Sequence, residues 1–582
     1  MNMNHHSMHT LLSFLVVFLL TPLVVIAGSG ATLAAPPPQV ATEVTGIVFN
    51  DQNENGIYDD GEAGIADVAV SNGVDVVRTA ADGSYTLPLI DDTVYFVTKP
   101  AAYMVPVDAN MVPQFYYIHY PNGSPEYIQE FRGIDPTGEM PESLDFPLYA
   151  LDEAMADNDF TFLAIGDTQV RDYQELVYFR DDIVADIVNE AAFGADFAVV
   201  LGDMLTDQLT VFDHYQQTMG LAGIPTFYLP GNHDMDLDAI DDTHHLDTYI
   251  SYFGPTNYSF DHGNAHFVML DNIRWLGATP NRSAGNFTDG FSEQALTWLA
   301  NDLATVPTDK LIVLGMHIPL VTKNDAPAPM TPGGDRDALY ALLADYDVLA
   351  LTGHSHVTEI DLPGDNVEAW GAAMPFTHIN AGAACGSWWV GPEDERGIPL
   401  AYQRDGAPNG YFVIDLQGNN FVPRMKGANV PMAKQMNVSL LSRWDLQLPA
   451  NTVTSGELGH TQLAVNVWAG SSQSTVTCAF DNGTETGGTQ SPFARDPFAI
   501  ARQQAADSWM LENRSWQNLL PPPIRAKIGP ENWLQTNASW HIWTCPLPAD
   551  LEAGAHRVTV SVDDGFGQTF TESYLFDIWA ME

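Results

Sequence analysis

The segment Thr226–Asp234, TFYLPGNHD, joins a short apolar run to the polar tetrapeptide Gly231-Asn232-His233-Asp234. The apolar part has the length and composition of a buried strand, and the glycine permits a sharp backbone turn where that strand ends. An amide, an imidazole and a carboxylate follow directly. The segment therefore predicts a strand that presents Asn232, His233 and Asp234 at its carboxyl end.

Four other apolar runs end in the same way. Phe160–Ile165 leads to Gly166-Asp167-Thr168-Gln169, Phe197–Leu201 to Gly202-Asp203, Leu311–Met316 to His317, and Val348–Thr352 to Gly353-His354-Ser355-His356. Helix-like stretches separate these runs, for example Tyr173–Ala192 and Ser292–Thr305, the second with Ser292 as its N-cap. Residues 155–415 are therefore predicted to form an alternating α/β domain.

The carboxyl ends of the strands in an α/β sheet meet at one edge, and functional sites lie there. A single Gly-Asp pair is usually a turn, and a single histidine is usually a core or surface residue. Here, five predicted strands are each followed by a residue of a type that binds metals. This recurrence is better explained if the side chains converge on one site. We expect seven side chains to meet there: Asp167, Gln169, Asp203, Asn232, His317, His354 and His356.

The regions on either side of this domain have a different pattern. Short alternating runs punctuated by Gly and Asp, such as Val44–Phe49 and Ala81–Leu87, predict a small β-sandwich over residues 40–150. Runs such as Gln462–Trp468 and Arg557–Asp563 predict a β-rich domain over residues 425–582. The predicted fold class is multidomain, with a central α/β domain between two β domains.

The N-terminus carries the apolar run Leu11–Ala27, followed by small residues and three prolines. This pattern is typical of a secretory signal peptide over residues 1–35, with cleavage between Ala27 and Ala35. The residues before the run include histidines but no Lys or Arg, so an uncleaved membrane anchor is an alternative. No later apolar stretch approaches 18 residues, so no membrane span is expected in the mature chain. We expect a secreted, periplasmic or cell-surface protein.

Composition narrows the choice of partners. The 582 residues include 74 Asp and Glu but only 22 Lys and Arg, which gives a formal net charge of −52. Nucleic acids and anionic lipid surfaces bind proteins largely through Lys and Arg, so the imbalance argues against both partners. The three cysteines cannot all pair within the chain. Cys478 and Cys545 lie in the same region and can pair, which would leave Cys385 free.

A second motif lies in the N-terminal region. Side-chain oxygens stand at positions 1, 3, 5, 9 and 12 of a calcium-loop spacing, with a carbonyl at position 7: Asp51, Asn53, Asn55, Asp59, Glu62 and Ile57. No helical pattern flanks the loop, so it is not part of a helix-loop-helix pair. It resembles the calcium loops of bacterial surface β modules. The two alternatives are a loop that binds Ca²⁺ and an acidic turn without an ion.

The middle domain resembles the calcineurin-like metallophosphoesterases. Their ordered pattern is Asp-x-His, Gly-Asp, Gly-Asn-His-Asp or Glu, a lone His, and Gly-His-x-His. The chain matches it over residues 158–415, except that Gln169 replaces the first His. The flanking β domains and the segments Asn380–Trp389 and Arg404–Tyr411 resemble the three-part, secreted bacterial members. The resemblance implies a central β-sandwich flanked by helices.

The resemblance also implies a centre of two divalent metal ions. By this resemblance, Asp203 would bridge the ions; Asp167, Gln169 and His356 would complete the first site, and Asn232, His317 and His354 the second. This mixture of nitrogen and oxygen ligands suits Mn, Fe or Zn better than calcium. His233 would face the phosphate and act in catalysis, and Asp234 would orient it.

The implied function is hydrolysis of phosphate esters through a metal-bridged hydroxide. Trp388 and Trp389 would either line the substrate pocket or pack in the core. A competing interpretation is a calcium-stabilised surface binding or adhesion protein with a degenerate phosphoesterase core, suggested by Gln169 and the calcium-type loop. The other ligand-type residues favour the enzyme, because an abandoned site has no reason to keep them. Phosphate monoesters and diesters are both open as substrates.

Overall fold

The computed structural model describes residues 42–151, 158–280, 285–323, 330–331, 334–367, 372–441, 450–492, 494–513 and 535–580. The predicted signal peptide, residues 1–35, lies outside these ranges. Within them, no helix is both long enough and apolar enough to cross a membrane.

Three of the predicted strand runs form parallel neighbours in one central sheet. β9, β10 and β11 pair in parallel, and β22 and β23 extend the sheet in antiparallel fashion. The strands, in spatial order, are β11 (Thr226–Leu229), β10 (Phe197–Leu201), β9 (Asp159–Ile165), β22 (Gly410–Gln417) and β23 (Asn420–Gly427). β10 and β11 are buried along their whole length, which explains their continuous apolar sequences.

The other two predicted runs lie in a second central sheet. Its strands, in spatial order, are β12 (Tyr258–His262), β13 (Ala265–Met269), β16 (Leu311–Gly315), β17 (Asp347–Thr352), β21 (Thr377–Ala381) and β18 (Thr358–Asp361). β13, β16, β17 and β21 are parallel, and the two edge strands are antiparallel. Two short pairs lie beside it: β14 (Ile273–Trp275) with β15 (Phe287–Asp289), and β19 (Asn366–Val367) with β20 (Ala372–Ala373).

The two central sheets pack face to face through phenylalanine rings. Phe227 of one sheet stacks on Phe260 of the other, with ring centroids 3.9 Å apart. Phe162 and Phe197 each meet Phe267 edge-on, at 5.3 and 5.1 Å. Burial of aromatic rings is a large favourable contribution to folding. The predicted central sandwich is confirmed.

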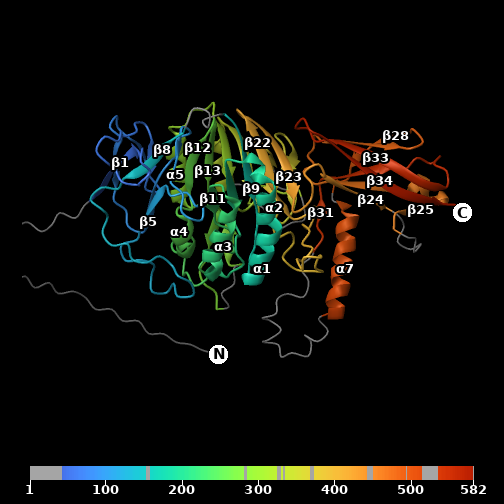
Figure 1. Ribbon diagram of the computed structural model, residues 1–582, viewed down its shortest axis with the longest axis horizontal. Coiled ribbons are helices and arrows are strands. Elements are labelled where there is room, and N and C mark those ends of the chain that lie inside the picture. Colours follow the sequence, from blue (N-terminus) through green and yellow to red (C-terminus); the bar gives the residue numbers. More distant parts are fainter. Residues whose placement is uncertain are drawn as a thin grey trace, which may run out of the picture. The chain divides into compact units, whose positions relative to one another are not determined.

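Helices flank the sandwich, and Figure 1 shows α1, α2 and α3 grouped together in teal and green. The helical segments are α1 (Tyr173–Phe179), η1 (Arg180–Val184), α2 (Ala185–Asn189), η2 (Ala191–Gly194), η3 (Leu209–Val211), α3 (Phe212–Met219), η4 (Gly220–Ala222), α4 (Asp247–Phe253), α5 (Glu293–Leu303), α6 (Asp335–Leu342), η7 (Ser455–His460) and α7 (Pro497–Asn513). Ser292 caps α5 as predicted, because its Oγ accepts a hydrogen bond from the Ala295 N–H.

The predicted helix Tyr173–Ala192 is not one α-helix. A π-helical turn, η1, interrupts it, and the helix ends at Asn189. Two buried carboxylates in this stretch bond to the start of β22: Asp182 accepts from Asn409, the residue before the strand, and Asp186 accepts from the hydroxyl of Tyr411 in the strand. These partners lie more than 220 positions away in the chain, so the local periodicity contains no signal for the wider turn.

Two four-stranded sheets form the N-terminal region. The first contains, in spatial order, β4 (Ser84–Pro88), β1 (Glu43–Asn50), β8 (Phe146–Ala150) and β6 (Tyr103–Met104); the second contains β3 (Val76–Arg78), β2 (Ala69–Ser71), β5 (Thr93–Val97) and β7 (Tyr116–His119). Their core is continuous with that of the central sandwich. Phe115, for example, packs on Phe227, and Phe96 packs on Trp298.

Two further sheets form the C-terminal region. The first contains, in spatial order, β24 (Met436–Leu441), β26 (Gln462–Val467), β32 (Ile542–Pro546) and β29 (Thr489–Gln490); the second contains β25 (Thr452–Thr454), β34 (Thr569–Trp579), β33 (Gly554–Asp563), β27 (Thr475–Phe480) and β28 (Glu485–Gly487). A small pair, β30 (Ala494–Arg495) with β31 (Ala538–Ser539), lies nearby in sequence. The predicted β architecture on both sides of the core is confirmed, while its domain limits remain predictions.

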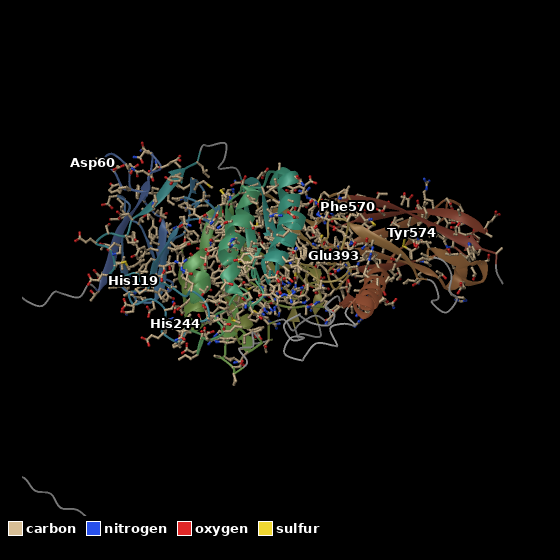
Figure 2. All side chains as sticks on the ribbon, turned by 60° about the horizontal axis from the view of Figure 1, so that its bottom comes forward. Asp60, His119, His244, Glu393, Phe570 and Tyr574 are labelled. Carbon is tan, nitrogen blue, oxygen red and sulfur yellow. A yellow bond between two sulfur atoms is a disulfide. The ribbon has the colours of Figure 1, made fainter. Side chains whose placement is uncertain are left out.

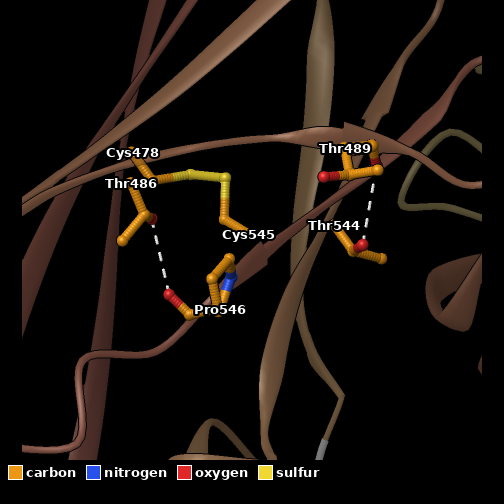
Figure 3. Close-up of a disulfide and its surroundings, with 6 residues drawn as sticks. All are labelled: Cys478, Thr486, Thr489, Thr544, Cys545 and Pro546. Atoms are coloured by element: carbon orange, nitrogen blue, oxygen red, sulfur yellow. Dashed lines mark hydrogen bonds between the residues drawn. A yellow bond between two sulfur atoms is a disulfide. The ribbon is translucent and has the colours of Figure 1, made fainter.

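A disulfide joins the two C-terminal sheets. Cys478 of β27 is bonded to Cys545 of β32, and two threonine hydroxyl bonds to backbone carbonyls lie close to it (Figure 3). Both cysteines belong to a separate apolar core that includes Val465 and Trp543. Cys385 is free and buried in the central domain.

Candidate metal centre

The five strand ends bring their polar residues to one place. Asp203, His317 and His354, which follow β10, β16 and β17, have ligand atoms that all lie within 4.8 Å of one another. His317 Nε2 is 3.3 Å from Asp203 Oδ2, 3.2 Å from Asn232 Oδ1 and 3.2 Å from His354 Nδ1. These four side chains come from both central sheets. They are the set that the resemblance assigns to the second metal together with the bridging carboxylate.

The remaining three predicted ligands are Asp167, Gln169 and His356. Gln169 Nε2 donates to Asp203 Oδ2 at 2.7 Å, and His356 Nε2 is 3.5 Å from Asp167 Oδ1. Asp203 Oδ2 thus contacts both Gln169 and His317. Asp203 therefore contacts a member of each predicted ligand set. For Gln169 to offer its oxygen to a metal, its amide would have to turn over.

Hydrogen bonds to the backbone orient two of the imidazoles. Nδ1 of His317 donates to the Leu201 carbonyl at 2.8 Å, and Nδ1 of His356 donates to the Gly386 carbonyl at 2.7 Å. Each bond leaves Nε2 directed at a carboxylate of the cluster. Metal-binding histidines are commonly held in this way, because the second nitrogen fixes both ring orientation and tautomer.

The backbone at these positions adopts a conformation that side-chain-bearing residues rarely take. Asp167, Gln169, Asp203, His354 and His356 have φ angles of 40°, 46°, 50°, 69° and 55°. Left-handed backbone at non-glycine residues costs free energy and concentrates at functional sites. The strand ends therefore carry conformational strain in order to turn these five side chains toward one point.

Two of the glycines that precede the predicted metal ligands leave space for carboxylates of the cluster. A Cβ on Gly231 would lie 2.2 Å from Asp203 Oδ1, and one on Gly353 would lie 2.3 Å from Asp167 Oδ2. Gly202, at φ +86°, is the only one of the predicted turn glycines with a left-handed backbone. The sequence predicts sharp turns at these glycines. The structure shows instead that at Gly231 and Gly353 the absence of a side chain lets a carboxylate approach the backbone.

The electrostatics of the cluster suit added positive charge. Among the described residues, the buried Asp167 Oδ1 has no hydrogen-bond donor. Burial raises the pKa of Asp167 to about 8, and the nearby charge of Asp203 adds to the rise. Burial also opposes ionisation of Asp203, but His317 and His233 outweigh it and lower its pKa. Divalent cations bound here would offset the cost of burying the charged carboxylates of Asp167 and Asp203. The donor set therefore fits metal ions.

His233 has a carboxylate partner that the sequence analysis did not identify. Its Nδ1 is 2.8 Å from Asp207 Oδ1, and its backbone N–H donates to Asp203 Oδ1 at 2.8 Å. Burial would lower the pKa of His233, but Asp203 and Asp207 raise it to about 9. The two carboxylates therefore favour the protonated form of the ring. Asp207 lies four residues after the Gly-Asp motif, which is a signal that local reading could have found.

Asp234 does not contact the His233 ring. Its carboxylate accepts hydrogen bonds from the backbone N–H groups of Met204, Leu205 and Gly231. These bonds hold the turn after β10 against the turn after β11, and so align Asp203 with Asn232. The orienting contact expected of Asp234 is made by Asp207 instead.

The two candidate pocket tryptophans are placed differently. Trp388 is partly exposed, and its ring lies 6.0 Å from that of His233 and 5.3 Å from that of His356. Trp389 is buried and donates its indole N–H to the Thr168 carbonyl at 2.8 Å, so it supports the loop of Asp167 and Gln169. Phe287, which the sequence analysis did not single out, meets the His354 ring edge-on at 6.2 Å.

The calcium-type loop lies outside this cluster, between β1 and β2. Its six predicted positions fold inward on one another. Asp59 Oδ2 accepts from the side-chain amides of Asn53 and Asn55, Asp51 Oδ2 accepts from Gly56 N–H, and the Glu62 carboxylate accepts from two backbone N–H groups. The Ile57 side chain is exposed.

Histidines elsewhere have other partners. His119 pairs with Asp91, and His244 pairs with Asp247. Figure 2 labels the two histidines. The hydrogen bonds and ion pairs described for these two histidines do not reach the seven-residue cluster.

Comparison with known proteins agrees with this geometry. Residues 160–358 match the family model of the calcineurin-like phosphoesterases, residues 52–133 match its N-terminal counterpart, and residues 378–570 match its C-terminal counterpart. A probable glycerophosphodiester phosphodiesterase GpdQ of Arcobacter nitrofigilis is 25% identical over 211 residues, 33% of this chain and 70% of that protein.

Two solved structures are also similar. A dimetal phosphatase from Danio rerio is 16% identical, with a TM-score of 0.32, and the match covers 46% of this chain and 96% of that one. A purple acid phosphatase from yellow lupin is 12% identical, with a TM-score of 0.34 and 67% coverage of each chain. The site and the sandwich define a metal-dependent hydrolase of phosphoric esters. The chain belongs to the calcineurin-like phosphoesterases, a family assignment that rests on the three model matches.

Proposed function

We propose that this phosphoesterase works with two divalent metal ions at the seven-residue cluster, with Asp203 between them. The convergence of Asp203, His317 and His354 carries the proposal. The mixed nitrogen and oxygen donors suit Mn, Fe or Zn. When bound, the ions would supply Lewis-acid polarisation of the phosphoryl group and an activated water.

The chain's own residues have separate tasks in this proposal. Asp207 holds Nδ1 of His233 at 2.8 Å, which leaves Nε2 as the nitrogen that can protonate the leaving oxygen. Asp234 ties the two strand ends together through backbone bonds. Trp388 and Phe287 lie against opposite histidines of the cluster and would form walls for the organic part of the substrate.

The reaction is tested with the full chain and two substrates. The GpdQ relative is named as a phosphodiesterase, so bis(p-nitrophenyl) phosphate is assayed beside p-nitrophenyl phosphate, each with added Mn²⁺, Fe²⁺ or Zn²⁺. Asp203→Asn should abolish turnover and reduce the number of metal ions bound per chain, because the neutral amide cannot bridge two cations. Asp213→Asn, at an exposed position of α3, serves as the control and should retain both properties.

Two outcomes would count against the proposal. Full activity and unchanged metal content in Asp203→Asn would exclude the bridging role. A wild-type protein that binds no metal and turns over neither substrate would favour the competing interpretation, a surface binding protein with a degenerate core.

We further propose that the N-terminal loop binds Ca²⁺ and that the protein is secreted. The inward-facing oxygens of Asp51, Asp59 and Glu62 support the first proposal. The Cys478–Cys545 disulfide supports the second, because disulfides persist in oxidising compartments. Sequencing the N-terminus of exported protein tests secretion: a start between residues 28 and 36 agrees with it, and an intact Met1 contradicts cleavage.

A further inference from the structure

Arg404 carries a partly buried positive charge near the proposed metal ligands. Acidic residues outnumber Lys and Arg by 74 to 22, and among the described residues eleven other Lys and Arg side chains pair with a carboxylate. Arg404 is partly buried, yet it forms no ion pair with any described residue. Its Nε is enclosed and has no hydrogen-bond acceptor within the described part of the chain. A desolvated cation without a partner is unfavourable, so this position needs an explanation.

Arg404 lies beside the proposed metal centre. Its backbone N–H donates to the His356 carbonyl at 3.1 Å. Electrostatically, Asp167 and Cys385 act on the Arg404 side chain, and Arg404 acts on His354 and His356. Burial lowers the pKa of Arg404, with Cys385 and Asp167 opposing the change. The positive charge of Arg404 in turn contributes to the lowered pKa values of His354 and His356.

A cation in this position would be repelled by two divalent metal ions unless an anion lay between them. The phosphoryl group of the substrate is such an anion. Guanidinium is always charged, and its planar fork matches two oxygens of a phosphate. We propose that Arg404 binds the non-bridging oxygens of the substrate phosphoryl group. This inference rests on the proposed phosphoesterase function and adds a substrate-binding residue to it.

The C-terminal region holds this arginine in place. The Asn537 N–H donates to the Arg404 carbonyl at 2.8 Å. The next residue, Asp405, accepts from the Thr358 N–H of β18, and its carboxylate lies 3.1 Å from Nε2 of His541, the residue before β32. A segment from outside the central sandwich therefore fixes the backbone of the proposed phosphate ligand. This arrangement gives the C-terminal β region a direct part in substrate binding.

The test compares Arg404→Gln and Arg404→Lys with wild type in the full, Mn-loaded chain. Inorganic phosphate is the probe, and its binding is measured by calorimetry and as competitive inhibition of nitrophenyl ester hydrolysis. Loss of a charge-assisted hydrogen bond should weaken phosphate binding at least about ten-fold in Arg404→Gln and less in Arg404→Lys, with metal content unchanged. Arg78→Gln, which removes one cation from β3, is the control and should bind phosphate normally.

Each of the other outcomes contradicts either the role of Arg404 or the proposed phosphoesterase function. Unchanged phosphate binding in folded Arg404→Gln would overturn the inference and leave the phosphoesterase proposal standing. Loss of a metal ion from Arg404→Gln would show that Arg404 supports the His356 loop instead of binding phosphate. If wild type itself neither binds phosphate nor hydrolyses an ester, the proposed function fails, and the inference fails with it.

Discussion

The contacts of His233 with individual residues suit it to act as a general acid. Its Nδ1 is bonded to Asp207, its backbone N–H to Asp203, and its ring edge meets Trp388. The two carboxylates raise its pKa to about 9, against the effect of burial. A protonated imidazole can serve as the general acid for a leaving oxygen, whereas a metal ligand must be neutral.

His233→Ala should therefore reduce turnover by about 10²–10⁴ while the metal content stays the same. In Asp207→Asn, the loss of the carboxylate should lower the pKa of His233, so the alkaline limb of the activity profile should move to lower pH. Turnover, metal content and pH profile are measured together. A lost metal ion in His233→Ala would assign the ring to the metal instead, and an unshifted limb in Asp207→Asn would separate Asp207 from the protonation of His233.

At the scale of elements, one buried histidine fastens α5 to the second central sheet. His266 of β13 bonds through Nδ1 to Asp261 at 2.7 Å and through Nε2 to Asp302 of α5 at 2.8 Å. Both ring nitrogens face carboxylates, so both must carry protons. Burial would lower the pKa of His266, but Asp302 and Asp261 raise it to about 9. The imidazolium thus joins a strand hairpin to a helix that also packs on the N-terminal region through Trp298 and Phe96.

The raised pKa of His266 predicts a dependence of stability on pH. Its contribution is fully present below pH 6.5, the value for an unperturbed histidine, and is lost as the pH rises through about 9. His266→Gln should therefore be destabilised by a few kcal/mol at pH 6, and the difference from wild type should vanish by pH 10. Urea unfolding of both proteins at the two pH values measures this. His214→Gln, at an exposed position of α3, is the control. An equal deficit at both pH values would contradict an ionic role.

At the scale of the whole molecule, the flanking regions are continuous with the catalytic sandwich. The apolar core of the N-terminal sheets extends into the central sheets, and Thr98 bonds to Ser259 of β12. On the other side, His541 and Asn466 of the C-terminal sheets hold Asp405 next to the proposed phosphate ligand. Substitutions in either flanking region should therefore also affect the central sandwich.

Calcium binding in the N-terminal loop should raise the stability of the full chain. With a dissociation constant of roughly 10⁻⁴–10⁻³ M, 10 mM Ca²⁺ would add about 1.4–2.7 kcal/mol. Thermal unfolding is followed with and without calcium, in constant Mn²⁺, for wild type and Asp59→Asn. Asp60→Asn changes the neighbouring exposed carboxylate outside the ligand spacing (Figure 2) and should respond like wild type. The absence of a calcium shift in wild type would leave an acidic turn without an ion.

Local sequence patterns were sufficient to predict the five strands and the polar residues at their ends. Both signals are local: buried parallel strands need continuous apolar runs, and the ligands follow within a few positions. The sequence also indicated the N-cap of α5 and the two β-rich flanks. The family resemblance supplied the order of the ligands, including the departure at Gln169.

The partners that those residues meet depend on the tertiary fold. Asp207 contacts His233 across 26 positions, Trp389 contacts Thr168 across 221, and Asp182 of the π-helical turn and Asp186 of α2 bond to Asn409 and Tyr411 at the start of β22. The left-handed backbone at Asp167 and its counterparts, and the Arg404 Nε that has no acceptor among the described residues, likewise have no local sequence signal. Local periodicity records which face of an element is buried, whereas these features arise from side chains that the fold brings together from separate strands.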